Sequence, residues 1–585
     1  MTDQSLGYAA VAPRRLRLRA ALRLPPAGSG LGRRGVALAT LALASPMAIY
    51  FWRNEGSFAN IVFTVGVTIA LVAAMATATR RLLASSVAVA ALVSIIVIAA
   101  SVKRATMNMV VHAYDLIFYF SSWSTLNFLW HDQRGYMVAL LAALAAAAAA
   151  IALAWRVDHA PVRRRHALLV FAAGVALAGL GAATKGERRH MQFNFANLYV
   201  SSFYASWAET LETLWRGQLL EAMEQGRAPL AAFGLPTDCK TDAKPPHIIL
   251  IHQESLVQPS LFPALDYDHG VDPMFRSQDG QVRKLRVETY GGASWLTEFS
   301  ILAGVSTHSF GGMRQFVQTF MQGRLKDTLP QALERCGYRN VVFYPMLKNF
   351  VSNDKFYTSV GLREIFDLKA QGAKTVNERD RFYFANALAE MERHFKASPK
   401  PLFTFIQTMS AHWPYDVKYM PEENVAGGGP GTHPEMHEYL RRVSMAKLDY
   451  DWLLAELHRR FPGERFLLAH YGDHQPMSTR MLLGYKDETE AEDVTLSPDS
   501  PGFITYYALD GVNFTVRANP SFDALDVPYL GTAILDAAGL PLSDSHAERR
   551  RLMALCQGRY YGCARRNEIL AFHRRLIDSG IMQAR

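Results

Sequence analysis

Residues 287–307, VETYGGASWLTEFSILAGVST, contain the turn and helix around which we expect the second half of the chain to be organised. Residues 291–294, Gly-Gly-Ala-Ser, form a polar corner that leads into apolar residues between 299 and 302, with the spacing of a buried helix face. The pattern predicts a helix with Ser294 near its N-terminus, where free backbone N–H groups favour an anion. An ordinary serine cap with Glu298 in the first turn explains the same residues, so the rest of the chain must decide.

An alternation of strand and helix patterns follows residue 246. Helical patterns separate five short apolar or β-branched runs that indicate buried strands, at 247–253, 340–345, 402–408, 465–471 and 503–509. This order predicts an α/β fold with a largely parallel central sheet and helices on both faces. Ligands of such folds bind at the carboxyl ends of the strands.

Polar side chains follow two of these predicted strands. Glu254 comes after the first strand, and Asp473 and His474 come after the fourth. Singly, a helix cap explains Glu254 and a turn explains Asp473-His474. Together with the Ser294 hydroxyl, they form a donor set that suits Mn²⁺ or Zn²⁺, and suits Mg²⁺ less because of the imidazole.

The first third of the chain is apolar. Five segments are close to the roughly 20 residues that cross a bilayer, and none carries an internal charge. They are 36–52, 58–79, 82–101, 135–155 and 167–184. We therefore predict a transmembrane domain of five helices over 36–184.

The formal net charge of +10 does not indicate nucleic-acid binding, because much of the arginine excess lies in the arm 1–35 and the loop around 163–165. That distribution follows the positive-inside bias of membrane proteins. It predicts a multi-pass protein of the inner (cytoplasmic) membrane with a cytoplasmic N-terminus and everything after residue 184 outside. Lys103 and Arg104 on the outer side run against the bias.

Between the third and fourth spans, residues 112–130 are rich in aromatic residues but interrupted by Asp115. They predict an interfacial helix, whereas a sixth span here would reverse the topology. Further along, we expect a juxtamembrane helix and linker over 185–245, an extracytoplasmic catalytic domain over 246–545 and a C-terminal tail over 546–585.

The four cysteines are Cys239, Cys336, Cys556 and Cys563, and none has zinc-site spacing. Cys556 and Cys563 flank a short glycine-containing segment that could close as a disulfide in an oxidising compartment. Buried free thiols are the alternative.

Four blocks of sequence carry a resemblance to a known family. They are Glu254-Ser255 after an apolar strand, Gly292 with Ser294 and Glu298-Phe299, His412-Trp413-Pro414, and Gly472-Asp473-His474. Over roughly residues 36 to 540 the chain resembles the lipoteichoic acid synthase family of the alkaline phosphatase and sulfatase superfamily, with its phosphoglycerol-transferring relatives. Five spans before an extracytoplasmic catalytic domain are that family's arrangement.

The resemblance implies that Glu254, Ser294, Asp473 and His474 bind a divalent metal, Mn²⁺ in first place with Zn²⁺ and Mg²⁺ as alternatives. It also implies that Ser294 is the nucleophile and that His412 contacts the substrate phosphate. The implied enzyme is a membrane-embedded phosphotransferase. It moves a phosphoglycerol headgroup from a membrane phospholipid to a glycan or lipid-linked acceptor through a covalent phospho-Ser intermediate.

Two departures from the family pattern keep alternatives open. The usual nucleophile is Thr, and Ser294 lacks its rotamer-fixing methyl group. The family's Phe-Trp-Asn-Arg stretch, which holds glycerol phosphate, is replaced by Phe-Val-Ser-Asn at 350–353. A phosphoethanolamine transferase or a sulfatase-like phosphodiester hydrolase therefore remains possible.

Two other classes fit less well. A sulfatase proper needs Pro and Arg at the second and fourth positions after its nucleophile, where this chain has Leu296 and Glu298. A non-catalytic membrane scaffold would have no need of the complete ligand set.

Overall fold

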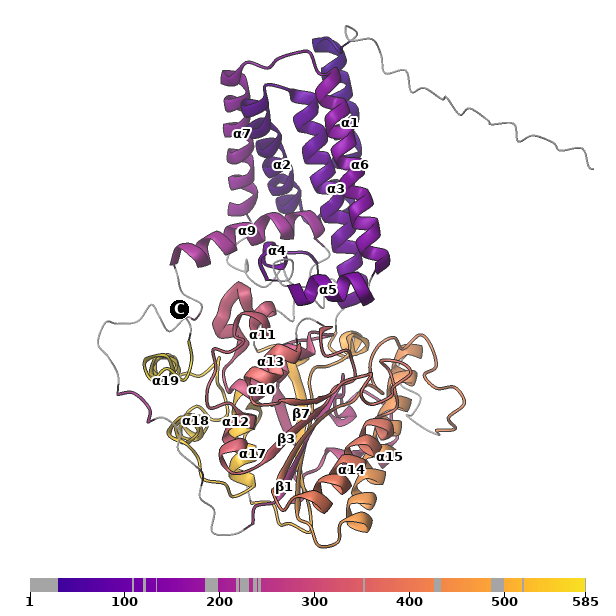
Figure 1. Ribbon diagram of the computed structural model, residues 1–585, viewed down its shortest axis with the longest axis vertical. Helices are drawn as coiled ribbons and strands as arrows, with labels where there is room; N and C mark the ends of the chain where they lie inside the picture. Colours follow the sequence, from indigo (N-terminus) through magenta and orange to yellow (C-terminus); the bar gives the residue numbers. More distant parts are fainter. Residues whose placement is uncertain are drawn as a thin grey trace, which may run out of the picture.

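The computed structural model describes residues 30–107, 110–118, 123–132, 134–184, 198–216, 220, 231–234, 239, 244–350, 353–425, 433–484, 499–517 and 520–583. Most of the predicted basic arm, residues 1–29, lies outside them. The described residues form a helical bundle and an α/β domain, which lie one above the other in Figure 1.

The five predicted spans are confirmed as helices. Among the described residues, five helices are long and apolar enough to cross a membrane. They are α1 (Arg33–Asn54), α2 (Phe58–Thr79), α3 (Leu82–Met107), α6 (Arg134–Val157) and α7 (Arg164–Ala183). The chain is therefore a multi-pass membrane protein.

Helices α2 and α7 pack with their backbones in contact. A Cβ atom added at Gly66 would lie 2.4 Å from the backbone nitrogen of Ala178, and one added at Gly174 would lie 2.7 Å from that of Ala70. Small residues at such a contact allow the close approach on which helix packing in lipid depends.

The aromatic segment 112–130 contains two short helices, α4 (Ala113–Phe118) and α5 (Trp123–Asp132), of 6 and 10 residues. At about 1.5 Å of rise per residue, neither is long enough to cross a bilayer. Their position in the membrane interface stays a prediction.

Helix α9 (Tyr199–Arg216) lies inside the predicted juxtamembrane region and runs across the base of the bundle. The buried Glu55 carboxylate accepts the N–H groups of Val200, at 3.1 Å, and Ser201, at 3.0 Å. A carboxylate that accepts these free N–H groups stabilises the first turn of the helix.

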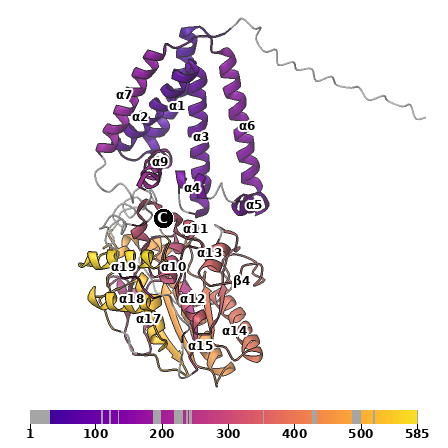
Figure 2. The same ribbon diagram turned by 60° about the vertical axis from the view of Figure 1, so that its left-hand side comes forward.

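Helix α4 joins the bundle to the soluble domain, and both views place it between them (Figures 1 and 2). Tyr114 and Phe118 pack against Phe316 of η4 (Thr307–Phe316), with ring centroids 5.5 and 6.0 Å apart. Lys103 of α3 pairs with Asp115 of α4 at 2.8 Å, both largely buried. The junction thus ties a membrane helix to the α/β domain.

The α/β domain is built on a sheet of eight strands in the described residues, in the order β4-β3-β5-β1-β6-β7-β2-β8. Strands β1, β3, β4, β5 and β6 run parallel, while β7 is antiparallel to both β6 and β2. The strands are β1 (His247–Gln253), β2 (Arg283–Arg286), β3 (Arg339–Phe343), β4 (Glu364–Phe366), β5 (Leu402–Gln407), β6 (Phe466–Gly472), β7 (Ile504–Val512) and β8 (Leu525–Asp526). The predicted α/β class with a mostly parallel sheet is confirmed.

Helices cover both faces of this sheet. Ile248 and Leu250 of β1 pack into one core and Ile249 and Ile251 into another, so every residue of the strand is buried. Figure 1 shows α14 (Asp380–Ala397) and α15 (Pro434–Arg460) on one side. The other side carries α10 (Ser294–Ala303), α12 (Leu329–Arg335) and α17 (Leu530–Ala537).

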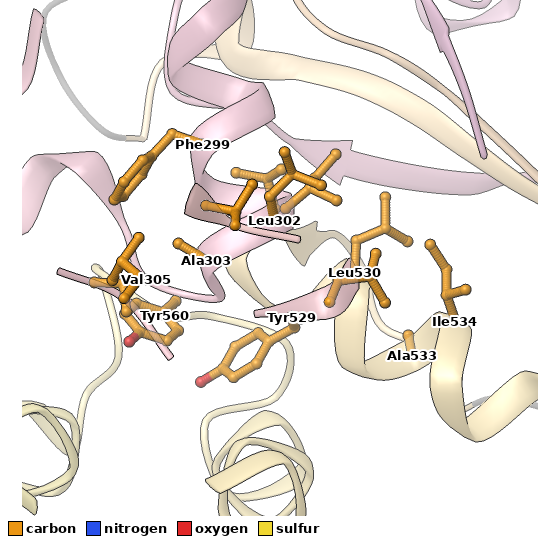
Figure 3. Close-up of a cluster of buried hydrophobic side chains, with 14 of the residues drawn as sticks. Phe299, Leu302, Ala303, Val305, Tyr529, Leu530, Ala533, Ile534 and Tyr560 are labelled. Atoms are coloured by element: carbon orange, nitrogen blue, oxygen red, sulfur yellow. The ribbon is translucent and has the colours of Figure 1, made fainter. Parts of the chain in front are cut away.

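Figure 3 shows part of the core on the side of the sheet that carries α10 and α17. Phe299 and Leu302 of α10 pack there near Leu530 of α17 and Tyr560. The remaining short elements are α11 (Val317–Phe320), α13 (Asn353–Ser359), η2 (Pro259–Leu261), η3 (His269–Phe275), η6 (Met477–Met481), η7 (Pro501–Phe503) and η8 (Val527–Tyr529).

The predicted tail 546–585 contains two helices that complete the same core, α18 (Asp544–Leu555) and α19 (Arg566–Asp578). Leu552, Ile569, Phe572 and Met582 are buried in it. The core of the α/β domain therefore extends well beyond residue 545, because the apolar faces of these helices are needed to cover α10 and α17.

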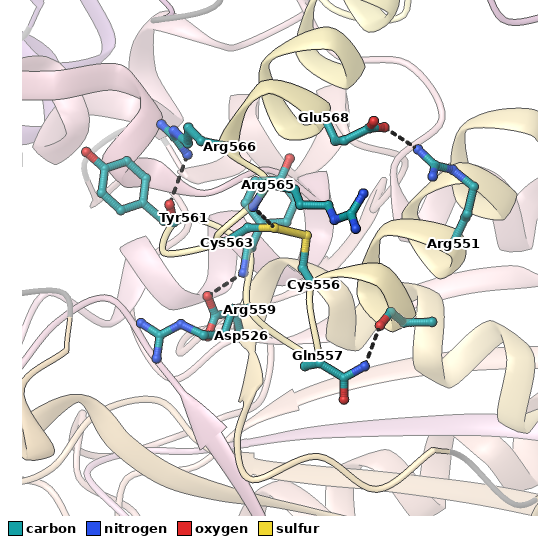
Figure 4. The surroundings of a disulfide bond; sticks show 12 residues. Asp526, Arg551, Cys556, Gln557, Arg559, Tyr561, Cys563, Arg565, Arg566 and Glu568 are labelled. Carbon is teal, nitrogen blue, oxygen red and sulfur yellow. Dashed lines mark hydrogen bonds and ion pairs between the residues drawn. A yellow bond between two sulfur atoms is a disulfide. The ribbon is translucent and has the colours of Figure 1, made fainter.

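The described residues contain two disulfides. Cys556 and Cys563 are joined between α18 and α19, which the Arg551–Glu568 ion pair also connects at 2.7 Å (Figure 4). Cys239 is joined to Cys336, 97 residues away. The first disulfide was one of two alternatives in the sequence, whereas nothing in the sequence indicated the second.

Candidate active site

Two neighbouring strands position the two carboxylates and the imidazole of the site. Glu254 directly follows β1, and Asp473 and His474 directly follow β6. The register of the parallel pair, which sets Gln253 opposite Gly472, brings these residues to the same level of the sheet edge.

Ser294 is the first residue of α10, as the sequence predicts. The corner before it is tightly turned, since Ala293 has a left-handed backbone at φ 63°, which costs free energy for a residue with a Cβ. The Ser294 hydroxyl donates to Glu254 Oε2 at 2.9 Å and lies 3.4 Å from His474 Nε2. Thr297 ties the same turn to β6 by donating to the carbonyl oxygen of Asp473 at 2.7 Å.

The His474 ring is held in one orientation. Its Nδ1 lies 3.0 Å from the carbonyl oxygen of Gln475, which accepts the Nδ1 proton. Nε2 then faces Glu254 Oε1 at 3.2 Å and Asp473 Oδ2 at 3.3 Å. A backbone acceptor on one ring nitrogen is the usual way in which a metal-binding histidine is oriented.

Asp473 is fully buried, and its two oxygens differ. Oδ1 accepts the Ser255 N–H at 2.7 Å, but Oδ2 has no hydrogen-bond partner in the described part of the chain. Buried carboxylate oxygens are rarely left in this state unless an ion or water satisfies them.

The electrostatics of the site reflect its paired charges. Burial alone would lower the pKa of His474, but the Asp473 and Glu254 carboxylates outweigh burial and raise it to about 9. Burial alone would raise the pKa of Glu254, but His474, and less strongly His412, hold it well below its usual value. The two carboxylates and the His474 imidazole therefore stabilise one another's charged forms.

The spacing of the donors fits a divalent cation. Donors about 2.1 Å from a shared ion lie roughly 3.0 to 3.4 Å apart in octahedral or tetrahedral geometry. Contacts among Glu254, Ser294, Asp473 and His474 span 2.9 to 3.4 Å. With an orphaned oxygen on Asp473, these residues fit the cation that the resemblance implies.

His412 lies apart from this cluster, in the loop after β5, where it is half-buried beside the exposed Trp413. Its charge acts on Glu254, so the structure places it near the four residues without bringing it into contact with them. Of the stretch 350–353 that replaces the family's glycerol-phosphate clamp, residues 351 and 352 lie outside the described residues.

Sequence reasoning missed His252 and gave no role to Glu298. His252 Nε2 lies 3.2 Å from Asp473 Oδ2, and its ring nitrogen groups with the Glu254 and Asp473 oxygens within 4.8 Å. Glu298 accepts Gln407 Nε2 at 3.0 Å, and burial raises its pKa to about 7. The only signal for His252 in the sequence was its place two residues before Glu254, near the end of a predicted strand.

Taken together, the fold and the site define a multi-pass membrane protein whose α/β domain brings Glu254, Asp473 and His474 together beside a serine at a helix N-terminus. Residues 249–514 match the family model for Sulfatase. Residues 249–514 therefore form a sulfatase-type domain, in agreement with the superfamily to which the resemblance points.

Individual relatives are distant. An uncharacterized protein of Haemophilus influenzae is 23% identical over 329 residues, which cover 53% of this chain and 56% of that protein. The chain thus spans about half the length of the curated relative that it matches.

Two solved structures are similar in fold. The phosphoglycerol transferase GacH of Streptococcus pyogenes, in complex with sn-glycerol-1-phosphate, is 17% identical, with a TM-score of 0.45 over 60% of this chain and 89% of that one. The lipooligosaccharide phosphoethanolamine transferase A of Neisseria meningitidis is 12% identical, with a TM-score of 0.47 over 90% of this chain and 94% of that one.

Proposed function

We propose that the chain is a metal-dependent phosphotransferase in which Ser294 is the nucleophile. The observation that carries this proposal is the position of the Ser294 hydroxyl. It lies at the N-terminus of α10, donates to Glu254 at 2.9 Å and lies 3.4 Å from His474. A nucleophile next to an acceptor for its proton and to a helix N-terminus that favours an anion is suited to attack on a phosphate.

Glu254, Ser294, Asp473 and His474 would hold the divalent cation, with Mn²⁺ in first place and Zn²⁺ and Mg²⁺ as alternatives. When bound, such an ion lowers the pKa of a ligating hydroxyl and neutralises charge on phosphoryl oxygens.

The residues of the chain support a two-step reaction. Ser294 Oγ attacks the phosphorus of a lipid phosphodiester, and its proton passes to Glu254 Oε2, which already accepts a hydrogen bond from this hydroxyl. The bond from phosphorus to the lipid oxygen breaks, and His412 gives that oxygen a proton, so diacylglycerol leaves. In the second step an acceptor hydroxyl gives its proton to His412 and attacks the phosphorus of the phospho-Ser. The bond from phosphorus to Ser294 Oγ breaks, Ser294 regains its proton from Glu254, and the headgroup leaves on the acceptor.

We further propose that the donor is a membrane phospholipid, the transferred group is phosphoglycerol and the acceptor is a glycan or lipid-linked hydroxyl. The blocks Glu254-Ser255 and Ser294 to Phe299 support phosphoglycerol by their resemblance to the family. The membrane helices support a lipid donor, because they hold the domain where that substrate is concentrated. Phosphoethanolamine is the alternative headgroup, because the clamp residues at 350–353 differ from the family's.

The catalytic domain, which we predicted over 246–545 and whose core extends beyond residue 545, then belongs outside the cytoplasm. The arginine distribution supports this orientation, and so do the Cys239–Cys336 and Cys556–Cys563 disulfides, which persist in oxidising compartments.

The test is to trap the adduct. Purified full-length protein is incubated with divalent metal and either phosphatidylglycerol or phosphatidylethanolamine, without acceptor, and the tryptic peptide containing Ser294 is analysed by mass spectrometry. We expect a glycerol phosphate adduct on Ser294, absent from Ser294→Ala and present in Ser294→Thr, which keeps the hydroxyl.

Each other outcome has a meaning. An ethanolamine phosphate adduct would assign the alternative headgroup, and release of the headgroup to water would assign a phosphodiester hydrolase. Full activity of Ser294→Ala would reject Ser294 as the nucleophile.

A further inference from the structure

His252 is a buried imidazole in the site that none of the proposed roles uses. It lies near the end of β1, and one of its ring nitrogens lies within 4.8 Å of carboxylate oxygens of Glu254 and Asp473. Only 1% of its surface is exposed. Its Nε2 lies 3.2 Å from Asp473 Oδ2.

The other ring nitrogen of His252 is held by a neighbour. Nδ1 lies 2.8 Å from the hydroxyl of Tyr471, the residue that faces His252 across the β1–β6 pair. Metal-binding histidines are oriented in this way, with one nitrogen bonded to a protein group and the other left for the ion.

The contact between His252 and Asp473 is close, but it lacks the angular geometry of a hydrogen bond. If His252 donated its Nε2 proton to Asp473, Oδ2 would have a hydrogen bond of ordinary geometry, yet it has none in the described residues. His474 Nε2 lies 3.3 Å from the same oxygen and does not bond it either. Two imidazole nitrogens therefore lie beside an unsatisfied oxygen at the separation of ligands that share an ion.

We propose that His252 is a further protein ligand of the divalent site, an inference that rests on the proposed metal role of Glu254, Asp473 and His474. The donor set then contains two imidazoles, two carboxylates and the Ser294 hydroxyl. Because imidazole suits Zn²⁺ better than it suits Mg²⁺, a second imidazole shifts the selectivity of the site towards Zn²⁺.

The experiment counts imidazoles on bound zinc. Purified full-length protein is loaded with Zn²⁺ alone, and X-ray absorption spectroscopy at the zinc edge gives the number of imidazole ligands. We expect two in the wild type and one in His252→Gln. Zn²⁺ affinity, measured by competition with a chromophoric chelator, should fall at least about tenfold in this variant.

His470→Gln is the matched control. His470 is also buried, lies on β6 opposite Ile251 and so projects to the other face of the sheet, with its Nδ1 3.2 Å from the Tyr506 hydroxyl. This variant should keep both the imidazole count and the affinity.

One imidazole in the wild type, or two in His252→Gln, would overturn the proposal. The wild-type count needs no variant, so a misfolded His252→Gln does not block the test. Failure of the proposed function looks different, because then no zinc is bound or Asp473→Asn binds it as well as the wild type does.

Discussion

The guanidinium of Arg442, on α15, donates through Nη1 to the backbone carbonyl oxygen of His412 at 2.5 Å. Its Nη2 donates to the carbonyl oxygens of Pro414, at 2.6 Å, and Val417, at 3.0 Å. Glu438 accepts from Nε at 2.8 Å. One buried arginine thus fixes the loop that carries the proposed phosphate-contacting histidine.

Arg442→Lys should loosen this loop, because a lysine ammonium cannot reproduce the planar set of donors. We expect turnover of a nitrophenyl phosphodiester to fall roughly 10- to 100-fold through misplacement of His412, with bound metal unchanged. Arg459→Lys, the same change on the exposed part of α15, should have no effect. Lost metal in Arg442→Lys would show that the arginine supports the whole site instead of the loop.

Chelation should abolish turnover, and added Mn²⁺ or Zn²⁺ should restore it, because the buried Asp473 Oδ2 has no partner in the described protein. The ion binds only the folded state, so Tm should rise with metal concentration. In Asp473→Asn we expect neither activity nor a metal-dependent Tm. An active Asp473→Asn variant would refute the proposal that Asp473 binds a metal needed for turnover.

Stability should fall in acid because of histidines in the C-terminal helices. Burial, with added repulsion from nearby arginines, lowers the pKa of His546 and His573 to about 3 each. A lowered histidine pKa means that the unfolded chain binds more protons, so stability is complete above the ordinary pKa of about 6.5 and is lost as pH falls towards 3.

His573→Gln should therefore reduce the slope of unfolding free energy against pH by about 1.4 kcal/mol per pH unit between roughly pH 6 and 4. The measurement is pulse proteolysis of the full chain in detergent across this range. His437→Gln, at an exposed position of α15, is the control and should leave the slope unchanged. If the free energy of unfolding depends on pH with the same slope in His573→Gln and in the wild type, His573 is not buried in its neutral form.

The two disulfides should contribute unequally. In the chain-entropy model, a bond closing 97 residues stabilises by about 4.7 kcal/mol and one closing 7 residues by about 2.3 kcal/mol. Paired Ser substitution of Cys239 and Cys336 should therefore lower Tm more than the same change at Cys556 and Cys563. The reverse order would mean that strain or residual unfolded-state structure dominates.

The α2–α7 contact should tolerate no added side chain. In Gly174→Val, the new Cβ would lie 2.7 Å from the backbone nitrogen of Ala70, a clash that only movement of a helix relieves. We expect a lower Tm and loss of monodisperse protein in detergent. Gly179→Val, on the same helix with nothing within 4 Å of its Cβ, is the control.

Much of the fold could be predicted from the sequence, because a long apolar run is compatible with few structures. The five predicted strands correspond to β1, β3, β5, β6 and β7, whereas β2, β4 and β8 span four, three and two residues and carry no periodic signal. The antiparallel direction of β7 depends on the path of the chain between β6 and β7, which the composition of the strands does not determine.

The candidate site could be predicted only in part, because apolar runs also hide some of its residues. Glu254 and Asp473 stand out because a charge ends an apolar run. His252 lies inside such a run, and a strand buried on both faces gives no clue to which face looks towards a ligand. Arg442 reaches His412 from 30 residues away through a fold that no local pattern specifies.

The packing of α4 against Phe316 has a kinetic meaning. A catalytic domain seated on its own membrane helices stays at one height above the bilayer instead of sampling a hemisphere on a loose tether. The encounter of such an enzyme with a lipid substrate is confined to the plane of the membrane. If the donor is the proposed membrane phospholipid, the rate of donor capture should depend on the number of donor lipids per unit area, so diluting the donor with inert lipid should slow the reaction whereas diluting the vesicles should not.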